Sequence, residues 1–126
     1  MKDINKYRGI IPAFYACYAS DGSISTEGVK ALTRHLIAKG VKGVYVGGSS
    51  GECIYQHPDE RKAVLEAVMS EAKGKITVIA HVACNNTADS VELAAHAESA
   101  ASTPSRPSRR STSTCQTTPS LPTGTP

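Results

Sequence analysis

Two adjacent serines, Ser49 and Ser50, stand in a glycine-rich run that suits the binding of an anion. Their hydroxyls and backbone N–H groups are hydrogen-bond donors. Gly47, Gly48 and Gly51 let the backbone turn sharply and approach a ligand closely. Glycine and serine also dominate ordinary turns for conformational reasons, so a plain turn between a strand and a helix is the alternative interpretation.

The residues before these serines have the composition of a buried strand. Val44 and Val46 are β-branched and Tyr45 is aromatic, which suits the interior of a sheet. Helical apolar patterns precede and follow the run, and this favours a parallel sheet. We therefore expect a strand that ends in the serine loop, with Glu52 tying the loop to backbone amides.

The first hundred residues alternate predicted strands and helices. A first strand over 9–18 has an irregular end because it contains Pro12, and another strand covers 76–82. Helices are predicted to begin at 25–26, at 57–60 and after 85–87, and the glycines at 40 and 74 end the first two. The apolar residues of the third helix are Val91, Leu93, Ala94 and Ala97. Strand intervals of about 30 residues suit βαβ crossovers.

Two architectures are built from such an alternation, an open doubly wound sheet and a closed barrel. The sequence has neither a Gly-x-Gly-x-x-Gly motif at its first helix nor the Lys-Ser/Thr ending of a P-loop. Dinucleotide binding is therefore not expected. Three βα units are too few to close a (β/α)8 barrel, which takes about 250 residues. The prediction is an α/β fold, either a three-stranded protein or an incomplete barrel.

The composition changes sharply after Ala101. Residues 102–126 are nearly all Ser, Thr, Pro or Arg, and a segment so poor in apolar side chains cannot offset its ordering entropy. We divide the chain into a folded part, 1–101, and a disordered tail, 102–126. Arginines at 106, 109 and 110 account for the whole net charge of +3. Without aromatic partners they are a weak signal, so no nucleic-acid partner is predicted.

The four cysteines, at 17, 53, 84 and 115, are far apart and lack the spacing of metal ligands. This pattern predicts free thiols in a reducing compartment and no metal site. No apolar run is long enough to span a bilayer, and the charged N-terminal residues do not suit a secretory signal. The predicted location is the cytoplasm, with no membrane partner.

Four segments of the sequence resemble one enzyme family closely. They are Gly9-Ile-Ile-Pro-Ala13, Gly43-Val-Tyr-Val-Gly-Gly-Ser-Ser-Gly-Glu52, Glu60-Arg61 and Ala72-Lys-Gly-Lys-Ile-Thr-Val-Ile-Ala-His-Val82. The family is that of dihydrodipicolinate synthase and N-acetylneuraminate lyase, which are class I aldolases, and the similarity covers about 7–99. Related synthases usually carry Gly-Thr-Thr-Gly-Glu in the loop and a glycine in place of His81. The additional glycine and His81 favour the lyase branch.

The resemblance implies a (β/α)8 TIM barrel of which this chain holds the first three βα units. It also implies a homotetramer, without metal or organic cofactor, that cleaves N-acetylneuraminate (sialic acid) reversibly to pyruvate and N-acetylmannosamine through a lysine Schiff base. In the family, the loop matching Ser49 and Ser50 holds the pyruvate carboxylate. The Schiff-base lysine and a proton-relaying tyrosine lie on later strands without matching positions here, so this chain is expected to be inactive. Lys73 and Lys75 border a strand start, the inert face of a barrel, and neither is assigned as the nucleophile.

The tail suggests why the later strands are missing. In a reading frame shifted by one base near Ala100 or Ala101, permitted codons spell a run that begins Leu-Asp-Ala-Ile-Ala-Thr-Ile-Pro-Pro-Ile-Tyr-Phe. This run is similar to the fourth strand of the family and the aromatic loop after it. Our hypothesis is a one-base frame change at that point of the coding sequence.

Other residues near the predicted loop have structural interpretations. A lone histidine such as His81 is more often a hydrogen-bonded core residue than a ligand, and Cys53 and Cys84 are expected to be buried, inert thiols. Asp59 and Glu60 suit a solvated helix start. Two functional alternatives stay open: dihydrodipicolinate synthase or another pyruvate-dependent aldolase, and a non-catalytic fragment that keeps carboxylate affinity.

Overall fold

The computed structural model describes residues 3–102. Its helices are α1 (Thr26–Ala38), α2 (Pro58–Ala72) and α3 (Thr87–Ser102), and its strands are β1 (Gly43–Val46) and β2 (Thr77–Ala80). Short 3₁₀ turns cover Asn5–Tyr7, Ser49–Gly51 and Cys53–Tyr55. The disorder predicted for the tail and the position of Cys115 lie outside the described residues.

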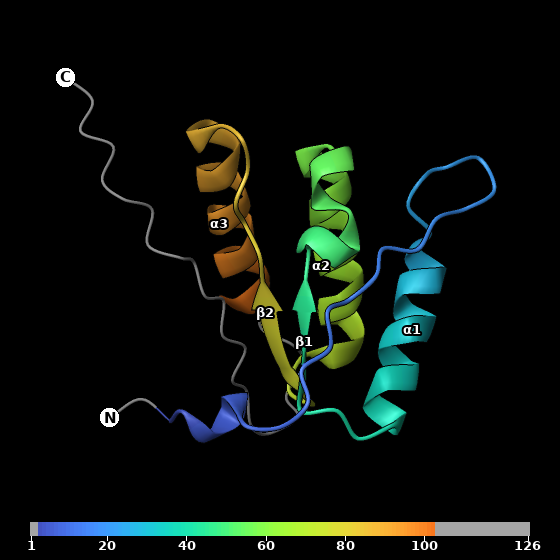
Figure 1. The fold of residues 1–126 in the computed structure, drawn as a ribbon, viewed down its shortest axis with the longest axis vertical. Coiled ribbons are helices and arrows are strands. Elements are labelled where there is room, and N and C mark those ends of the chain that lie inside the picture. Colours follow the sequence, from blue (N-terminus) through green and yellow to red (C-terminus); the bar gives the residue numbers. More distant parts are fainter. Residues whose placement is uncertain (1–2, 103–126) are drawn as a thin grey trace.

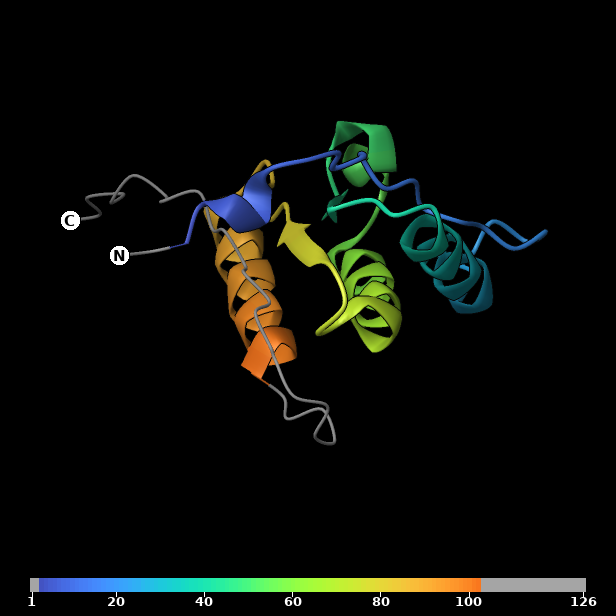
Figure 2. The same cartoon turned by 90° about the horizontal axis from the view of Figure 1, so that it is seen from below.

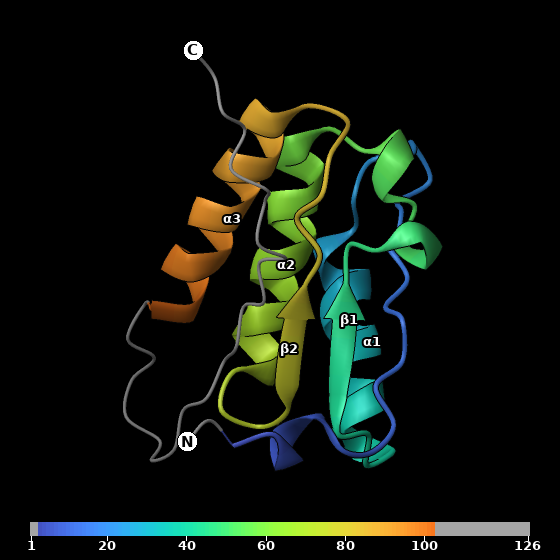
Figure 3. The same ribbon diagram turned by 60° about the vertical axis from the view of Figure 1, so that its left-hand side comes forward.

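The two strands form a parallel pair, as the sequence predicted. Val44 lies beside Val78 and Tyr45 beside Ile79 in the ladder. Figure 3 shows the strands side by side and pointing the same way, with α2 behind them. Since α2 connects the two strands, this part of the chain is a βαβ unit.

The strand expected over 9–18 is not a full strand, and this prediction was wrong in extent. The segment runs beside β1 with a single parallel bridge, between Ala13 and Tyr45. The Tyr45 N–H donates to the Pro12 carbonyl at 2.9 Å, and the Phe14 N–H donates to the Tyr45 carbonyl at 2.8 Å. Pro12 therefore faces β1, and because proline has no N–H it cannot donate a ladder bond of its own.

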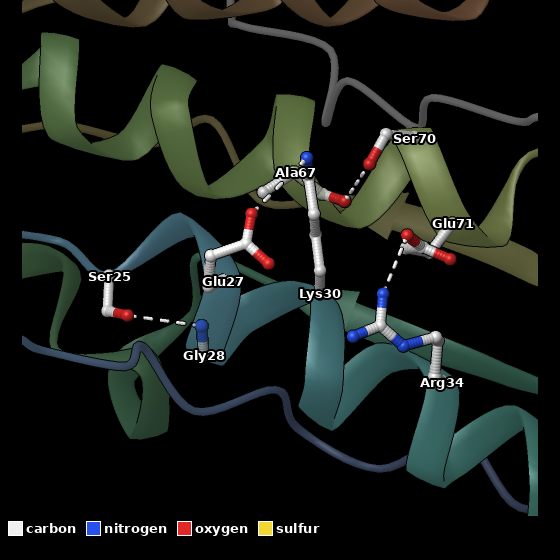
Figure 4. A network of polar contacts seen from close by, with 8 residues as sticks. All are labelled: Ser25, Glu27, Gly28, Lys30, Arg34, Ala67, Ser70 and Glu71. Atoms are coloured by element: carbon white, nitrogen blue, oxygen red, sulfur yellow. Dashed lines mark hydrogen bonds and ion pairs between the residues drawn. The ribbon is translucent and has the colours of Figure 1, made fainter.

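The helix ends confirm the signals in the sequence. The Ser25 side chain accepts an N–H of the first turn of α1 at 3.1 Å, which satisfies a donor that the helix itself cannot (Figure 4). Pro58 opens α2, and the Asn86 side chain accepts an N–H of the first turn of α3 at 2.8 Å. Gly40 and Gly74, past the ends of α1 and α2, have φ of +81° and +77°, which glycine adopts without strain.

The hydrophobic core lies between the strands and the helices. All three helices cover the same side of the sheet (Figures 1 and 2). Buried apolar side chains on that side come from both strands and from every helix: Val29, Val44, Val46, Val64, Leu65, Val68, Val78, Ala80, Leu93 and Ala97. Of the apolar residues expected in α3, Leu93 and Ala97 are buried, whereas Val91 is 58% exposed. Tyr45 and Ile79, which alternate with the buried strand residues, are half-buried on the other side.

Candidate functional site

The candidate site begins at the carboxyl end of β1, where the chain leaves the sheet. Gly47 has a φ of +79°, a left-handed conformation that favours glycine. A Cβ built on Gly48 would lie 2.6 Å from Cε1 of Tyr45, so a larger residue there would displace the Tyr45 ring. Glycine is therefore favoured at both positions, where the chain passes from β1 into the turn Ser49–Gly51.

Ser49 and Ser50 lie in this turn, directly after the strand, and both are exposed. The turn is closed by backbone hydrogen bonds of 3.0 Å from Gly51 N–H to the Gly48 carbonyl and from Glu52 N–H to the Ser49 carbonyl. Neither serine hydroxyl, and neither serine N–H, has a hydrogen-bond partner among residues 3–102. Both hydroxyls and both N–H groups are therefore available to an acceptor such as a carboxylate.

A hollow of about 370 Å³ lies between the loops that follow β1 and β2. Ser49 lines it from the first loop, His81 and Cys84 from the second, and Arg61 from α2. Ser50 is not among its lining residues. The fold thus joins one of the two predicted serines to residues of the neighbouring strand end.

Arg61 is the component of the site that sequence reasoning missed. It is only 6% exposed, although it belongs to a charged run at the start of α2. Its Nη1 donates to the Ala83 carbonyl at 2.9 Å and to Cys84 Sγ at 3.0 Å. Its Nη2 donates to the His81 carbonyl at 2.7 Å and more weakly to the Gly47 carbonyl at 3.4 Å. One guanidinium therefore binds the backbone beyond the ends of both strands.

Helical periodicity could have identified this arginine. Arg61 precedes Val64, Leu65 and Val68 by three, four and seven residues, and all three are buried. Residues at these spacings lie on one face of a helix. The position of Arg61 on the buried stripe, rather than its neighbours in the chain, was the informative signal.

His81 is a hydrogen-bonded residue of the strand end, in agreement with the more conservative interpretation. Its Nδ1 lies 2.9 Å from the Gly47 carbonyl oxygen. The same nitrogen lies 3.3 Å from Arg61 Nη2. A carbonyl only accepts and a guanidinium only donates, so the two contacts favour opposite tautomers, and the shorter one favours the proton on Nδ1. The His81 and Tyr45 ring centroids are 5.9 Å apart. The imidazole thus fastens the turn at Gly47 to the end of β2.

Glu52 does not bind backbone amides, so that prediction was wrong. Its Oε2 accepts the Tyr18 hydroxyl at 2.6 Å, and Gln56 Nε2 donates to the same hydroxyl at 2.9 Å. The backbone of Glu52 is left-handed, with φ 61° and ψ 34°, and directs its side chain toward the segment before α1. The hydrogen bond to the Glu52 carboxylate raises the pKa of Tyr18, and burial adds to this effect.

The two cysteines predicted near the loop line the hollow together with Ser49, whereas neither of the two lysines at the strand start lines it. Cys53 is buried as predicted, Cys84 is half-buried, and the cysteines within 3–102 are free. Lys75 lines a separate hollow of about 570 Å³ at the amino ends of the strands, and Lys73 Nζ donates to the Ala100 carbonyl at 3.3 Å. The described part of the chain has no cluster of three or more metal-ligating side chains. None of its helices is long and apolar enough to cross a bilayer.

Comparison with known families and proteins identifies the relatives of this chain. The model of the dihydrodipicolinate synthetase family matches residues 6–103. The chain belongs to this family. Among its curated members, the N-acetylneuraminate lyase of Mediterraneibacter gnavus is 67% identical over 98 residues, which are 78% of this chain and 31% of the relative. The N-acetylneuraminate lyase of an Enterobacter species is 44% identical over 90 residues, 71% of this chain and 30% of the relative.

Solved structures of the family agree with this assignment. A Ruminococcus gnavus sialic acid aldolase, a catalytic lysine mutant, superimposes with a TM-score of 0.78 and 66% identity, over 79% of this chain and 33% of that chain. A Clostridium difficile protein solved in complex with mannosamine gives a TM-score of 0.67 and 36% identity, over 74% and 31%. The parallel βα units therefore match part of the barrel of a sialic acid aldolase. The chain spans about a third of the length of these relatives.

Proposed function

We propose that this chain carries the carboxylate-binding loop of an N-acetylneuraminate lyase, the enzyme that reversibly cleaves sialic acid to pyruvate and N-acetylmannosamine. The observation that carries the proposal is the unpartnered pair Ser49 and Ser50 at the end of β1. Its support is the 67% identity to such a lyase over 98 residues. The intact lyase is proposed to be a cytoplasmic homotetramer.

The chemistry of the turn suits a 2-keto acid. A carboxylate has two oxygens that accept hydrogen bonds, and the serines offer both hydroxyls and N–H groups from a short turn on a strand end. Such a site fixes the carboxylate without ordering a long cationic side chain. A pyruvate bound in this way would present its keto carbonyl to a nucleophile supplied from elsewhere in the barrel.

We propose that this chain by itself does not perform the cleavage. The family reaction runs through a Schiff base on a lysine, and no lysine is among the described residues that line the hollow beside Ser49. The chain therefore supplies a binding loop and not the covalent anchor. Restoring the reading frame near Ala101, as the codons permitted by the tail suggest, is proposed to restore the strands that carry this lysine.

Titration of pyruvate into the chain tests the carboxylate site. We expect saturable binding that is lost in the double variant Ser49→Ala/Ser50→Ala. Ser23→Ala is the matched control, because Ser23 lies in an exposed turn before α1 and its loss should leave binding unchanged. If the unaltered chain shows no saturable binding of pyruvate, the proposed carboxylate site does not exist in this chain.

Borohydride reduction in the presence of pyruvate tests the missing nucleophile. We expect no increase in mass, since reduction traps only a Schiff base that has formed. A lysine labelled in this chain would contradict the assignment of the nucleophile to later strands.

The coding DNA and the restored protein test the lyase assignment itself. The base sequence after the codon for Ala101 should encode the predicted apolar run in the shifted frame. The restored protein should then cleave sialic acid in preference to condensing pyruvate with aspartate semialdehyde. The opposite preference would identify a dihydrodipicolinate synthase.

A further inference from the structure

Arg61 is the only charged side chain among residues 3–102 that is buried, at 6% exposure. No carboxylate within this range lies within 4.0 Å of its guanidinium, and its Nε has no hydrogen-bond partner there. Removing an unpaired charge from water costs several kcal/mol unless strong contacts offset the loss. An apolar side chain would fill this part of the α2 stripe without that penalty. The charge therefore calls for an explanation other than packing.

The contacts of the guanidinium explain its place in the fold. The strand ladder ends at Val46 and Ala80, and the last rung is the hydrogen bond of 2.8 Å from His81 N–H to the Val46 carbonyl. Beyond this rung, Arg61 donates to carbonyls on both sides, those of Gly47 and His81. The arginine thus continues the connection between β1 and β2 after the backbone ladder has stopped.

The same contacts reach the serine turn through one peptide group. The Gly47 carbonyl accepts from Arg61 Nη2 and from His81 Nδ1, and Gly47 is where the chain bends into the turn. A side chain there would crowd this arrangement, because a Cβ on Gly47 would lie 3.3 Å from the His81 carbonyl and 3.8 Å from Arg61 Nη2. The orientation of the Gly47 peptide sets the direction in which Ser49 leaves the strand.

We propose that Arg61 is a positioning residue for the carboxylate loop, holding the Gly47 peptide so that Ser49 and Ser50 present their donors to the ligand. This inference rests on the proposed function for the identity of the ligand. In this role Arg61 acts through its contacts with Gly47 and His81. Its buried positive charge also borders the hollow lined by Ser49, where poor screening favours an anionic ligand over a neutral one.

Amide hydrogen exchange in the full 126-residue chain, followed by NMR, separates positioning from general stabilisation. In Arg61→Met, the Gly51 and Glu52 amides, whose hydrogen bonds close the turn, should exchange about 10- to 100-fold faster, as expected for loss of hydrogen bonds to a charged group. The Val68 amide in α2 should keep its exchange rate. Arg61→Lys, which keeps the charge, should restore part of the protection and provides the same comparison if Arg61→Met does not fold.

Arg34→Met is the matched control, because Arg34 is also a helix arginine but pairs with Glu71 on the surface at 3.0 Å. It should leave the turn amides unchanged. Equal acceleration of the turn and of α2 in Arg61→Met, or an unaltered turn in the folded Arg61 variants, would overturn the positioning role.

Pyruvate titration of the same variants distinguishes this inference from the proposed function. Weaker binding in Arg61→Met than in Arg34→Met supports both. If the unaltered chain binds no pyruvate but the turn amides respond to Arg61→Met as described, the carboxylate site fails and the positioning of the turn stands. If pyruvate binds equally well to both arginine variants, the positioning role fails and the carboxylate site stands.

Discussion

Glu52 combines a strained backbone with a side-chain contact at the edge of the candidate site. Among residues 3–102 it is the only non-glycine residue with a positive φ, 61°. A left-handed backbone costs a residue with a Cβ roughly 1–2 kcal/mol. Strain of this kind persists where the surrounding structure determines the conformation, often at functional sites. Here the residue joins the turns Ser49–Gly51 and Cys53–Tyr55.

Two substitutions at this position separate the strain from the contact. Both Glu52→Gly and Glu52→Ala remove the carboxylate that accepts the Tyr18 hydroxyl, but only glycine relieves the backbone. We expect Glu52→Gly to be more stable than Glu52→Ala by about 1 kcal/mol. Urea unfolding of the two variants measures this difference. Equal free energies of unfolding would mean that the left-handed conformation stores no strain.

The contact itself predicts a pH dependence at high pH. The Glu52 carboxylate raises the pKa of Tyr18 in the folded chain, so the folded state holds this proton more tightly than the unfolded state. The resulting stabilisation is complete below the ordinary tyrosine pKa of about 10 and is lost as the pH rises through the folded-state value. In a titration of phenolate absorbance, Glu52→Gln should lower the midpoint of the highest-titrating tyrosine.

Two tyrosine variants assign this transition. Tyr18→Phe should remove it, whereas Tyr55→Phe, which alters a residue 78% exposed, should leave it in place. A highest transition that survives in Tyr18→Phe would refute the assignment.

The start of α1 depends on one side-chain cap. Ser25 accepts the Gly28 N–H at 3.1 Å, and Figure 4 shows this bond beside the contacts between α1 and α2. We predict that Ser25→Ala lowers the free energy of unfolding by about 1 kcal/mol, since the N–H is left without its partner. Thermal unfolding of the variant measures the loss.

Ser70→Ala in α2 is a matched control for the same chemical change. Ser70 Oγ donates to the Ala67 carbonyl at 2.7 Å within the helix, a bond that competes with helical geometry. Because alanine has the higher helix propensity, this variant should be as stable as the unaltered chain or slightly more stable. A similar loss in both variants would show that the cap contributes nothing specific.

The sequence was sufficient for elements specified by local signals and insufficient for those that depend on distant residues. Capping residues and apolar residues at helical spacing predicted α1, α2 and α3, and a glycine marked the end of the first two. The β-branched run predicted β1. The extent of the first strand depended on whether the backbone of Pro12 faces β1 or points away from it. Only the register between the two segments decides this. The burial of Arg61 depended on carbonyls some 20 residues further along the chain, so its charged neighbours were misleading. The serine turn was placed correctly because glycine, strand and loop signals coincide there.

The described part of the chain leaves one edge and one face of its sheet without a neighbouring element. Within residues 3–102, β2 pairs only with β1, and the helices all cover one side (Figure 2). The other side carries Tyr45 and Ile79 as neighbours in the ladder, both half-buried. In a closed barrel further strands pair with such an edge and side chains fill the interior. Here the same surfaces favour association between chains.

We predict that the chain associates through this edge as its concentration rises, and that a charge on the open face opposes association. Ile79→Lys places an ammonium beside Tyr45, where pairing with another strand would desolvate it, and should raise the concentration needed for association about tenfold, equivalent to 1.4 kcal/mol. Val91→Lys adds the same charge on the outer side of α3, where the residue is 58% exposed, and should have no such effect. Sedimentation velocity over a concentration series compares the two variants. If both shift association equally, net charge rather than the open sheet controls it, and the unpaired edge of β2 is not the contact.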